Sequence, residues 1–438
     1  MSSTLKGQQI LAPILALLAA ASMWFYVRRI LVPRQVTEGA RLERPRGNLS
    51  DLYPRWLGAR ELLLHGRDPY SPEITREIQR GYYGRELDSS RPNDPKDQSS
   101  FAYPVYVVFL LAPTVFMSFS LVKVLSFWFL TACATLSVLL WERWLNLPFS
   151  QWRTLAIVVL LLGSYPFIEG VSLQQPVILV AFLLAGSCFA RQRGWLVVSG
   201  VLLALTTIKP QVAFVPVTVM LFWVTGDWRP RQRWLWGFAA TMLTLLAAAE
   251  FILPGWLFRF YKAVHSYQIY MANTSFLDWL VTPRWSNSVW VLIVSLIVWI
   301  AWRVRASSSN SPDARRVFCL ALVAVVCTSP NLALYNQILL LPGVLLWFER
   351  VESAQPGGAL TRFLGILLAA LLAWPWFACV VLIGARLLFG AEGFVQRAWQ
   401  MPHYAALSLP VVLLILLLLL PSVTVTSRRT SPAIEILA

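Results

Sequence analysis

The stretch Gly47-Asn-Leu-Ser-Asp-Leu-Tyr-Pro-Arg-Trp56 opens a polar segment in an otherwise apolar chain. An apolar run from Gln8 to Val32 precedes it, and a long string of apolar runs begins at Phe101. Of the 438 residues, 57% are hydrophobic and only 13% are charged, whereas soluble domains carry about a quarter charged residues. The sequence therefore predicts an all-α polytopic membrane protein, with one integral membrane domain over residues 1–438.

The polar segment covers residues 34–100 and holds twelve of the 37 basic and eleven of the 21 acidic residues. We expect it to be a long first extracytoplasmic loop. Apolar residues between Leu52 and Leu64 recur with helical spacing, which predicts a short helix on the membrane surface, with Arg55, Arg60 and Glu61 on its other face. Residues 84–99 are rich in turn-forming residues and predict an irregular surface segment.

The first apolar run is too long for the core of a signal peptide and lacks a small-residue cleavage site before Arg28-Arg29. We expect it to remain as a transmembrane helix. The later runs are placed at about 101–118, 121–140, 154–168, 176–190, 195–208, 211–226, 234–253, 288–303, 316–328, 336–349, 363–384 and 405–420. Several are shorter than the ~20 residues that span a bilayer as a straight helix, so we expect tilted, extended or broken spans.

Basic residues in the connectors predict the orientation in the membrane. The net charge of +16 comes largely from short loops that carry arginine, such as 191–193, 229–233, 303–316 and 350–362, and such loops stay in the cytoplasm. For both ends of the chain to lie there, one of the runs 101–118 and 121–140 must enter the membrane without crossing it. Pro104 and Pro113 favour the first. We therefore expect about twelve spans, a cytoplasmic tail at 421–438 and a place in the plasma membrane, with membrane lipids rather than nucleic acid as the partner of the basic residues.

Several kinds of chemistry find no support in the sequence. The five cysteines all lie inside apolar runs without the spacing of a zinc site or a disulfide framework. No HExxH, GxSxG, P-loop or GxGxxG arrangement is present to indicate a protease, a hydrolase or a nucleotide enzyme. We expect no cofactor and no metal, because the acids are scattered and Lys or Arg can neutralise a phosphate.

The predicted topology gathers polar residues at the extracytoplasmic ends of the spans. Charged groups at membrane depth usually face a bundle interior or an aqueous cavity, so such residues are functional candidates. Lys209 stands out, because Pro210 interrupts the helix directly after it. Glu169 and Glu250 fit equally well as side chains that reach to the headgroups, and interfacial positions are the favoured interpretation of His265 and His403. The full set is Asp51, Arg55, Glu169, Gln174, Gln175, Lys209, Gln211, His265, Tyr267, Asn331, Tyr335 and Asn336.

A series of short motifs gives the chain a resemblance to a known family. They are Asp51-Leu-Tyr53, Ala59 with Leu64-x-Gly66-x-Asp68-Pro69-Tyr70, Phe101-Ala-Tyr103-Pro104 with Pro113, Gln174-Gln175 and Ile208-Lys209-Pro210. In this order and spacing the sequence resembles the polyprenyl-phosphate-sugar-dependent glycosyltransferases of the GT-C fold. It is most similar to glycosyltransferase family 87, which includes bacterial α-1,2-mannosyltransferases that elongate phosphatidylinositol mannosides and lipoglycans.

The resemblance implies an enzyme that moves a sugar, with mannose expected, from a polyprenyl phosphate to a glycolipid or glycan hydroxyl with inversion. It implies that Asp51 is the catalytic base and that Lys209 lies near the donor phosphate. Arg55, one helical turn after Asp51, either binds that phosphate, holds the carboxylate or faces headgroups. Contacts to the substrates are expected from Tyr53, Asp68, Tyr70, Tyr103, Gln174, Gln175, His265, Asn331 and Tyr335.

The same residues leave some alternatives open. Asp68 in Gly-Arg-Asp-Pro-Tyr fits a turn residue better than a second acid. The family often has Tyr-Pro-Pro where this chain has Tyr103-Pro104-Val105, and Gly-Asn or Gly-Gln where it has Gln174-Gln175, which bears on the shape of the pockets.

Two other classes of protein compete with the enzyme. A transporter or flippase is compatible with many spans, but it usually shows two related halves with matching broken helices, and no such repeat is visible. A scaffold protein would leave Asp51 and Lys209 without a role.

Overall fold

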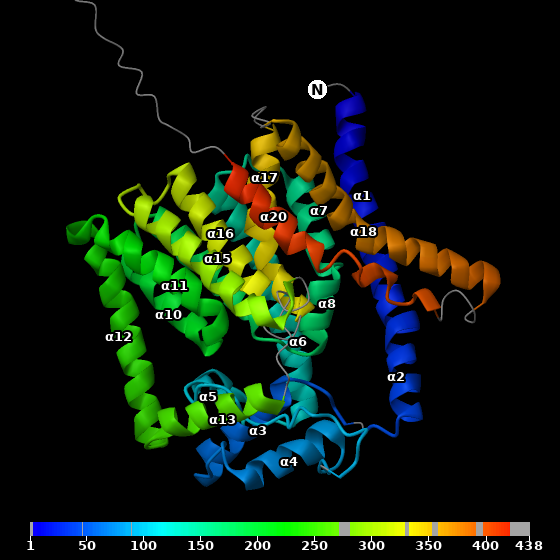
Figure 1. Ribbon diagram of the computed structural model, residues 1–438, viewed down its shortest axis with the longest axis vertical. Coiled ribbons are helices and arrows are strands. Elements are labelled where there is room, and N and C mark those ends of the chain that lie inside the picture. The colour runs from blue at the N-terminus through cyan, green and yellow to red at the C-terminus, as the bar shows by residue number, and fades with distance from the viewer. Residues whose placement is uncertain are drawn as a thin grey trace, which may run out of the picture.

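The computed structural model describes residues 3–45, 47–88, 90–270, 281–328, 333–352, 358–390 and 397–420. Within these ranges the regular structure is entirely helical (Figure 1). The helices are α1 Ser3–Tyr26, η1 Val27–Leu31, α2 Val32–Arg41, α3 Leu52–His65, α4 Pro72–Tyr83, α5 Val107–Leu111, η2 Ala112–Thr114, α6 Phe119–Leu145, α7 Gln151–Leu162, α8 Tyr165–Ser172, α9 Val177–Gln192, α10 Leu196–Leu205, η3 Thr206–Ile208, α11 Pro210–Thr225, α12 Trp228–Ile252, α13 Trp256–Tyr270, α15 Pro283–Arg303, α16 Pro312–Thr328, η4 Leu334–Leu340, α17 Leu341–Glu352, α18 Ala359–Phe389, η5 Met401–His403 and α20 Ser408–Leu419.

Six helical segments in the described part of the chain are long and apolar enough to cross a membrane. They are Ile10–Arg41, Phe119–Leu145, Trp228–Ile252, Arg284–Arg303, Ala359–Phe389 and Met401–Leu419. The pair α7 and α8, bent by 56°, makes a seventh if it is one span. The protein is thus an all-helical, multi-span membrane protein. The expected twelve spans are not confirmed, because helices such as α9 and α11, with 16 residues each, extend only about 24 Å against a hydrocarbon core of about 30 Å.

The bend between α7 and α8 has a local cause. A Cβ on Gly163 would lie 2.2 Å from Cβ of Ala20 on α1, so only glycine allows this approach. Ser164 then caps α8 by accepting a hydrogen bond from the backbone N–H of Phe167 (3.4 Å). The chain therefore turns sharply, and α8 packs against η4.

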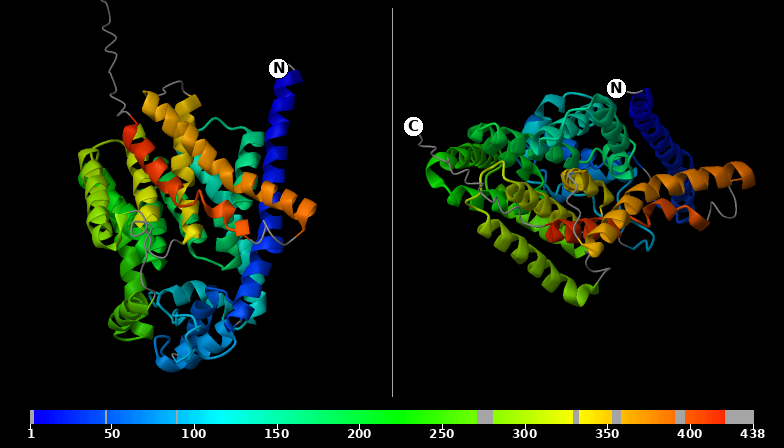
Figure 2. Two further views of the ribbon diagram at one scale, coloured as in Figure 1. Left: turned by 45° about the vertical axis from the view of Figure 1, so that its right-hand side comes forward. Right: turned by 90° about the horizontal axis from the view of Figure 1, so that it is seen from above.

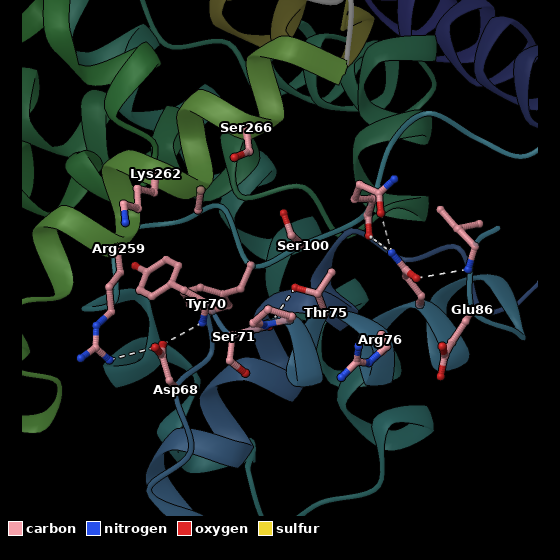
Figure 3. Close-up of a pocket in the computed structure, with 16 residues that line it drawn as sticks. Asp68, Tyr70, Ser71, Thr75, Arg76, Glu86, Ser100, Arg259, Lys262 and Ser266 are labelled. Atoms are coloured by element: carbon pink, nitrogen blue, oxygen red, sulfur yellow. Dashed lines mark hydrogen bonds and ion pairs between the residues drawn. The ribbon is translucent and has the colours of Figure 1, made fainter. Parts of the chain in front are cut away.

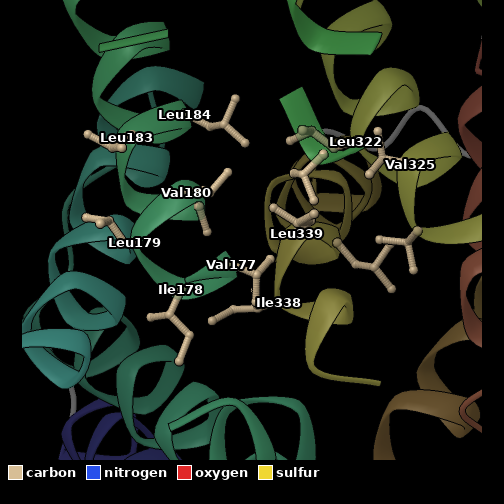
Figure 4. Packing of buried hydrophobic residues seen from close by; sticks show 14 of the residues in the cluster. Val177, Ile178, Leu179, Val180, Leu183, Leu184, Leu322, Val325, Ile338 and Leu339 are labelled. Carbon is tan, nitrogen blue, oxygen red and sulfur yellow. The ribbon is translucent and has the colours of Figure 1, made fainter. Parts of the chain in front are cut away.

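The centre of the helical bundle is α16, whose residues from Ala314 to Cys327 are buried except for Arg316. A helix that is apolar on all sides belongs in the interior of a bundle. Figure 4 shows this core from close by: Val180 and Leu184 of α9 face Leu322 of α16, with Leu339 of η4 alongside. The core fixes the positions of α9 and η4, and α9 in turn fixes the loop that precedes it.

A layer of short helices lies at one end of the molecule, opposite the start of α1 and the end of α20 (Figures 1 and 2). It consists of α3, α4, α5 and α13. The five residues of α5 rise only about 7.5 Å. This segment of the run 101–118 therefore does not cross a membrane as a helix, in agreement with the interpretation based on Pro104 and Pro113.

The predicted helix in the loop is confirmed as α3, but the prediction for its polar face is wrong. Arg55 and Glu61 are buried, with exposed fractions of 2% and 8%. The ends of both side chains have partners inside the protein: Glu61 pairs with Arg67 at 2.8 Å, and Arg55 bonds to backbone carbonyls. Two of the three residues of the predicted polar face are therefore buried, while Arg60 is half-buried.

Arginine side chains link the basic connectors by hydrogen bonds to backbone carbonyls of other connectors. Arg231, at the start of α12, donates to the carbonyls of Trp223 and Arg305, both at 2.6 Å, and to that of Ser307 at 2.9 Å. Arg315 donates to the carbonyl of Leu145 at 3.1 Å. Three connectors that are far apart in sequence, those after α6, α11 and α15, are therefore linked to one another, as expected of loops on one side of a membrane.

Candidate active site

Asp51 stands at the N-cap position of α3, yet its carboxylate makes no capping bond to the helix. An aspartate at this position usually accepts a hydrogen bond from the first turn. Here Oδ1 accepts a hydrogen bond from the hydroxyl of Tyr82 at 2.9 Å, and Oδ2 accepts one from the side-chain amide of Gln175. The backbone N–H of Asp51 donates to the carbonyl of Leu173 at 3.1 Å. The carboxylate is thus turned away from its own helix and held between two other segments.

The residues before Asp51 are joined to the end of α4. Asn48 donates its side-chain amide to the carbonyl of Gly81 at 2.9 Å, and the N–H of Leu49 donates to the carbonyl of Tyr82 at 3.3 Å. A Cβ on Gly47 would lie 2.2 Å from that carbonyl oxygen, so the close approach requires glycine. This contact places the ring of Tyr82 beside Asp51.

The environment of Asp51 favours a base that titrates above the usual range. Burial raises the pKa of this carboxyl group, while Arg55, the Tyr82 hydroxyl, Lys209 and Gln175 act in the opposite direction. The net shift is upward, because removal from water penalises the charged form more than these partners stabilise it. A carboxylate of this kind suits the role of general base.

Arg55 supports the backbone around Asp51. Its Nε donates to the carbonyl oxygen of Asp51 at 2.8 Å and its Nη2 to that of Gln174 at 3.3 Å. Its guanidinium lies over the ring of Tyr103, 4.6 Å from the centroid. Arg55 is thus buried in the protein and does not face headgroups, and its hydrogen bonds go to backbone carbonyls rather than to the carboxylate of Asp51.

Lys209 lies between η3 and α11, at the break that Pro210 predicts. Its side chain is buried: Nζ donates to Oδ1 of Asn336 at 2.9 Å and lies 4.8 Å from the centroid of the Tyr335 ring. The charge of Lys209 also acts on Asp51. The fold therefore brings Lys209 and the predicted base into one polar region, together with η4.

Glu169 on α8 belongs to the same region. Its Oε1 accepts a hydrogen bond from the hydroxyl of Tyr165 at 3.2 Å, and the backbone N–H of Tyr335 also acts on this carboxyl group. Glu250 lies at the exposed end of α12, where its carboxylate accepts a hydrogen bond from the backbone N–H of Gly255 at 2.7 Å.

Gln174 and Gln175 form the loop between α8 and α9 that faces Asp51. Gln174 adopts a φ of +51°. Its side-chain oxygen accepts a hydrogen bond from the hydroxyl of Ser50, and the side-chain amide nitrogen of Gln175 donates to Oδ2 of Asp51. Both glutamines therefore lie beside Asp51. Tyr82 is a site residue that the sequence analysis missed, since nothing near position 82 resembles a motif.

Some residues that were predicted to contact the substrates do not lie beside Asp51. Tyr53 packs edge-on against Phe119, with ring centroids 4.9 Å apart, and its hydroxyl abuts Gly81, so it has a packing role. His265 is exposed on α13, with its ring beside Tyr261. Asn331 lies outside the described residues. The structure does not bring Tyr53 or His265 to Asp51.

Asp68 and Tyr70 line a separate cavity of about 630 Å³ between α4 and α13 (Figure 3). The carboxylate of Asp68 accepts a hydrogen bond from the backbone N–H of Tyr70 at 2.9 Å, which confirms Asp68 as a turn residue. The same carboxylate forms an ion pair with Arg259 at 2.8 Å. The hydroxyl of Tyr70 donates to the carbonyl of Tyr103 at 2.5 Å.

A second cavity, of about 540 Å³, is mainly apolar and lies among α1, α7, α17, α18 and α20. At one end it is lined by Ser164, Tyr165 and Gln337, which belong to or adjoin the elements that carry Glu169 and Asn336. At the other end it reaches Arg153 and Glu352. In the described part of the chain, no group of three or more His, Cys, Asp or Glu residues is arranged to hold a metal ion.

An all-helical membrane protein with a half-buried, doubly hydrogen-bonded carboxylate and a buried lysine nearby has the features of an enzyme. The sequence model of glycosyltransferase family 87 matches residues 101–330. The chain belongs to this family and is a membrane glycosyltransferase. Tyr103, Gln174, Gln175 and Lys209 lie within the matched region, and Asp51 precedes it. No curated protein and no solved structure matches the chain.

Proposed function

We propose that this glycosyltransferase moves a sugar, with mannose the expected one, from a polyprenyl-phosphate donor to a hydroxyl of a glycolipid or glycan acceptor. The observation that carries the proposal is the carboxylate of Asp51, held by Tyr82 and Gln175 in a region that also contains Lys209. The family supplies the reaction class, transfer of a glycosyl group.

In the proposed reaction, Asp51 takes the proton of the acceptor hydroxyl as its oxygen attacks C1 of the donor sugar. The bond from C1 to the acceptor oxygen forms while the bond from C1 to the phosphate oxygen breaks, so the configuration inverts. A positioned base of this kind contributes roughly 10²–10⁴-fold to the rate. Two hydrogen bonds to the carboxylate fix the direction in which it accepts the proton.

The leaving group is a polyprenyl phosphate, whose growing negative charge needs a cation or hydrogen-bond donors. We assign this role to Lys209, because its ammonium group is buried and held by Asn336 and the ring of Tyr335. Arg55 is assigned to positioning the base, since its Nε and Nη2 already bond to carbonyls.

The apolar cavity supports a donor that carries a lipid. An isoprenoid chain is strongly driven out of water, and this cavity is enclosed by helices of the membrane bundle. Its polar end is lined by Tyr165, which bonds to Glu169. We propose that the prenyl chain lies here and that its phosphate is presented to Lys209.

The arrangement of the chain supports an extracytoplasmic site in the plasma membrane. The described chain begins and ends at one end of the molecule, whereas α3 and α4 lie at the other (Figure 1). Because arginine-bearing connectors stay in the cytoplasm, both termini are proposed to be cytoplasmic, and Asp51 to face outward.

The direct test is transfer by the purified protein in lipid nanodiscs. Polyprenyl phosphates carrying mannose, glucose or arabinose are supplied with a crude glycolipid fraction, and the products are analysed by mass spectrometry and NMR. We expect one labelled sugar to appear on a glycolipid with an anomeric configuration opposite to that of the donor. Retention of configuration, or use of nucleotide sugars alone, would contradict the proposal.

A further inference from the structure

The cavity between α4 and α13 has walls with an unusual composition. From α4 it is lined by Pro72, Thr75, Arg76 and Gln79, and from α13 by Arg259, Lys262, Ala263 and Ser266. Both sets follow the spacing i, i+3, i+4 and i+7, so each is one face of a helix. Figure 3 shows Lys262 and Ser266 on one side of the space, across from Tyr70 and Thr75. Two mainly polar helix faces therefore border a space of about 630 Å³ instead of packing together.

The charges around this cavity are largely neutralised within the protein. Arg259 pairs with Asp68 at 2.8 Å, Glu86 with Arg80 at 2.5 Å, and Arg76 with Glu73 at 3.3 Å. One further charged residue, Lys262, also lines the cavity, and its Nζ lies 4.4 Å from the centroid of the Phe258 ring on the same helix. The remaining polar lining residues are hydroxyl and amide residues, Ser71, Thr75, Gln79, Gln98, Ser100 and Ser266, and the ring residues are Tyr70 and Phe101. Uncharged donors and acceptors beside aromatic rings suit a neutral molecule rich in hydroxyl groups better than a bare anion.

The outer face of α13 has a different character. Leu257, Phe258 and Tyr261 are 61%, 63% and 64% exposed, and they alternate with the cavity-lining positions along the helix. A helix with one polar and one apolar aromatic face is typical of a membrane surface. In Figure 1, α13 runs across the end of the bundle, at an angle to α12. The cavity is therefore bordered by a helix suited to the boundary between lipid and water.

Two short connections lead from the cavity to the base. Tyr70, in the cavity wall, donates to the carbonyl of Tyr103, whose ring lies under Arg55, and Arg55 bonds to the carbonyl of Asp51. Along α4, Gln79 lines the cavity, and Tyr82, three residues later, donates to Asp51. The cavity thus adjoins the base without including it.

We propose that the cavity between α4 and α13 is a carbohydrate subsite, which holds the part of the acceptor glycan that lies beyond the reacting sugar. This inference rests on the proposed function, because it takes Asp51 as the point of transfer. The volume is in the range of ligand pockets, about 300–1,000 Å³, and the carbohydrate reaches it beside α13 at the membrane surface.

The experiment measures equilibrium binding of defined probes by the full-length protein in nanodiscs. The probes are octyl disaccharides built from mannose, glucose or galactose, and binding is followed by calorimetry. Ser266→Trp and Thr75→Trp fill the cavity from opposite walls. Leu257→Trp is the matched control, because it adds the same side chain on the outer face of α13. Binding of polyprenyl phosphate by each variant shows whether the donor half of the protein is intact.

We expect the wild-type protein and Leu257→Trp to bind at least one probe equally, and both cavity variants to bind it at least tenfold more weakly with unchanged affinity for polyprenyl phosphate. Unchanged probe binding in the cavity variants, or no probe bound by the wild type, overturns the subsite. A wild-type protein that binds probes but transfers no sugar from any polyprenyl-phosphate donor overturns the proposed function instead.

Discussion

Gln175 donates its side-chain amide to Oδ2 of Asp51, a contact between residues 124 positions apart in the chain. The other carboxylate oxygen accepts from Tyr82. Because both oxygens have donors from different segments, the orientation of the carboxylate depends on the loop after α8 and on the end of α4.

Asp51→Asn should lower sugar transfer by roughly 10²–10⁴-fold, because it removes the base and keeps the size of the side chain. Initial rates with a polyprenyl-phosphate sugar and its acceptor measure the effect. Asp97→Asn is the matched control: this loop aspartate bonds to the N–H of Ser99 rather than to Gln175. Melting temperatures near that of the wild type show that both variants fold. Turnover close to the wild-type rate in Asp51→Asn would remove Asp51 from the mechanism.

The rate should fall on the acidic side at a pH above the ordinary aspartate pKa of about 3.9. Burial raises the pKa of Asp51, and the active base is the charged form, so activity is lost as the pH decreases through this raised pKa. The Tyr82 hydroxyl stabilises the charged form; Tyr82→Phe should therefore move the acidic limb to higher pH.

The control for this pH profile is Tyr83→Phe, since the neighbouring hydroxyl donates to the carbonyl of Asp97 instead. Its acidic limb should coincide with that of the wild type. If Tyr82→Phe leaves the limb in place, or moves it to lower pH, the titrating group is not Asp51.

Lys209→Met should weaken use of the donor more than use of the acceptor. Hydrogen bonds to charged groups contribute about 1.5–3 kcal/mol, so we expect the donor KM to rise roughly tenfold to a hundredfold. Lys123→Met, on α6, removes a lysine outside the polar region and should have no effect. A titration that shows equal affinity of Lys209→Met and wild type for polyprenyl phosphate would assign Lys209 a structural role.

Cysteine labelling tests which side of the membrane the site occupies. Asp88 and Ser308 are both exposed, and the five native cysteines are buried, so the background should be low. In intact cells, Asp88→Cys should react with an impermeant thiol reagent and Ser308→Cys should react only after lysis. The opposite pattern would place Asp51 in the cytoplasm and end the argument for a lipid-linked donor.

Local patterns in the sequence predicted local structure well. The spacing of apolar residues after Leu52 predicted α3, Pro210 predicted the break at Lys209, and Asp68 before Pro69 predicted a turn. Each of these depends on residues within one or two helical turns. Gln174-Gln175 entered the candidate site through the predicted topology and the family resemblance rather than through such a local pattern.

The sequence could not predict which side chains are buried by segments that are distant along the chain. Arg55 and Glu61 share a polar face, and periodicity cannot distinguish a polar face in water from one buried against carbonyls or an ion pair. Tyr82 was missed because its role depends on the approach of Gly47 to the end of α4. Hydropathy likewise gave no means to tell a short buried helix such as α9 from a full span.

The bond between Lys209 and Asn336 joins residues 127 positions apart, and this has a consequence for biosynthesis. At about 5–20 residues per second, the ribosome adds the partner of Lys209 roughly 6–25 s after the lysine itself. Until then the ammonium group lacks the amide that receives it in the finished protein. The segment from α10 to α11 must therefore remain hydrated around Lys209, or be sheltered by the insertion machinery, while the following helices are made.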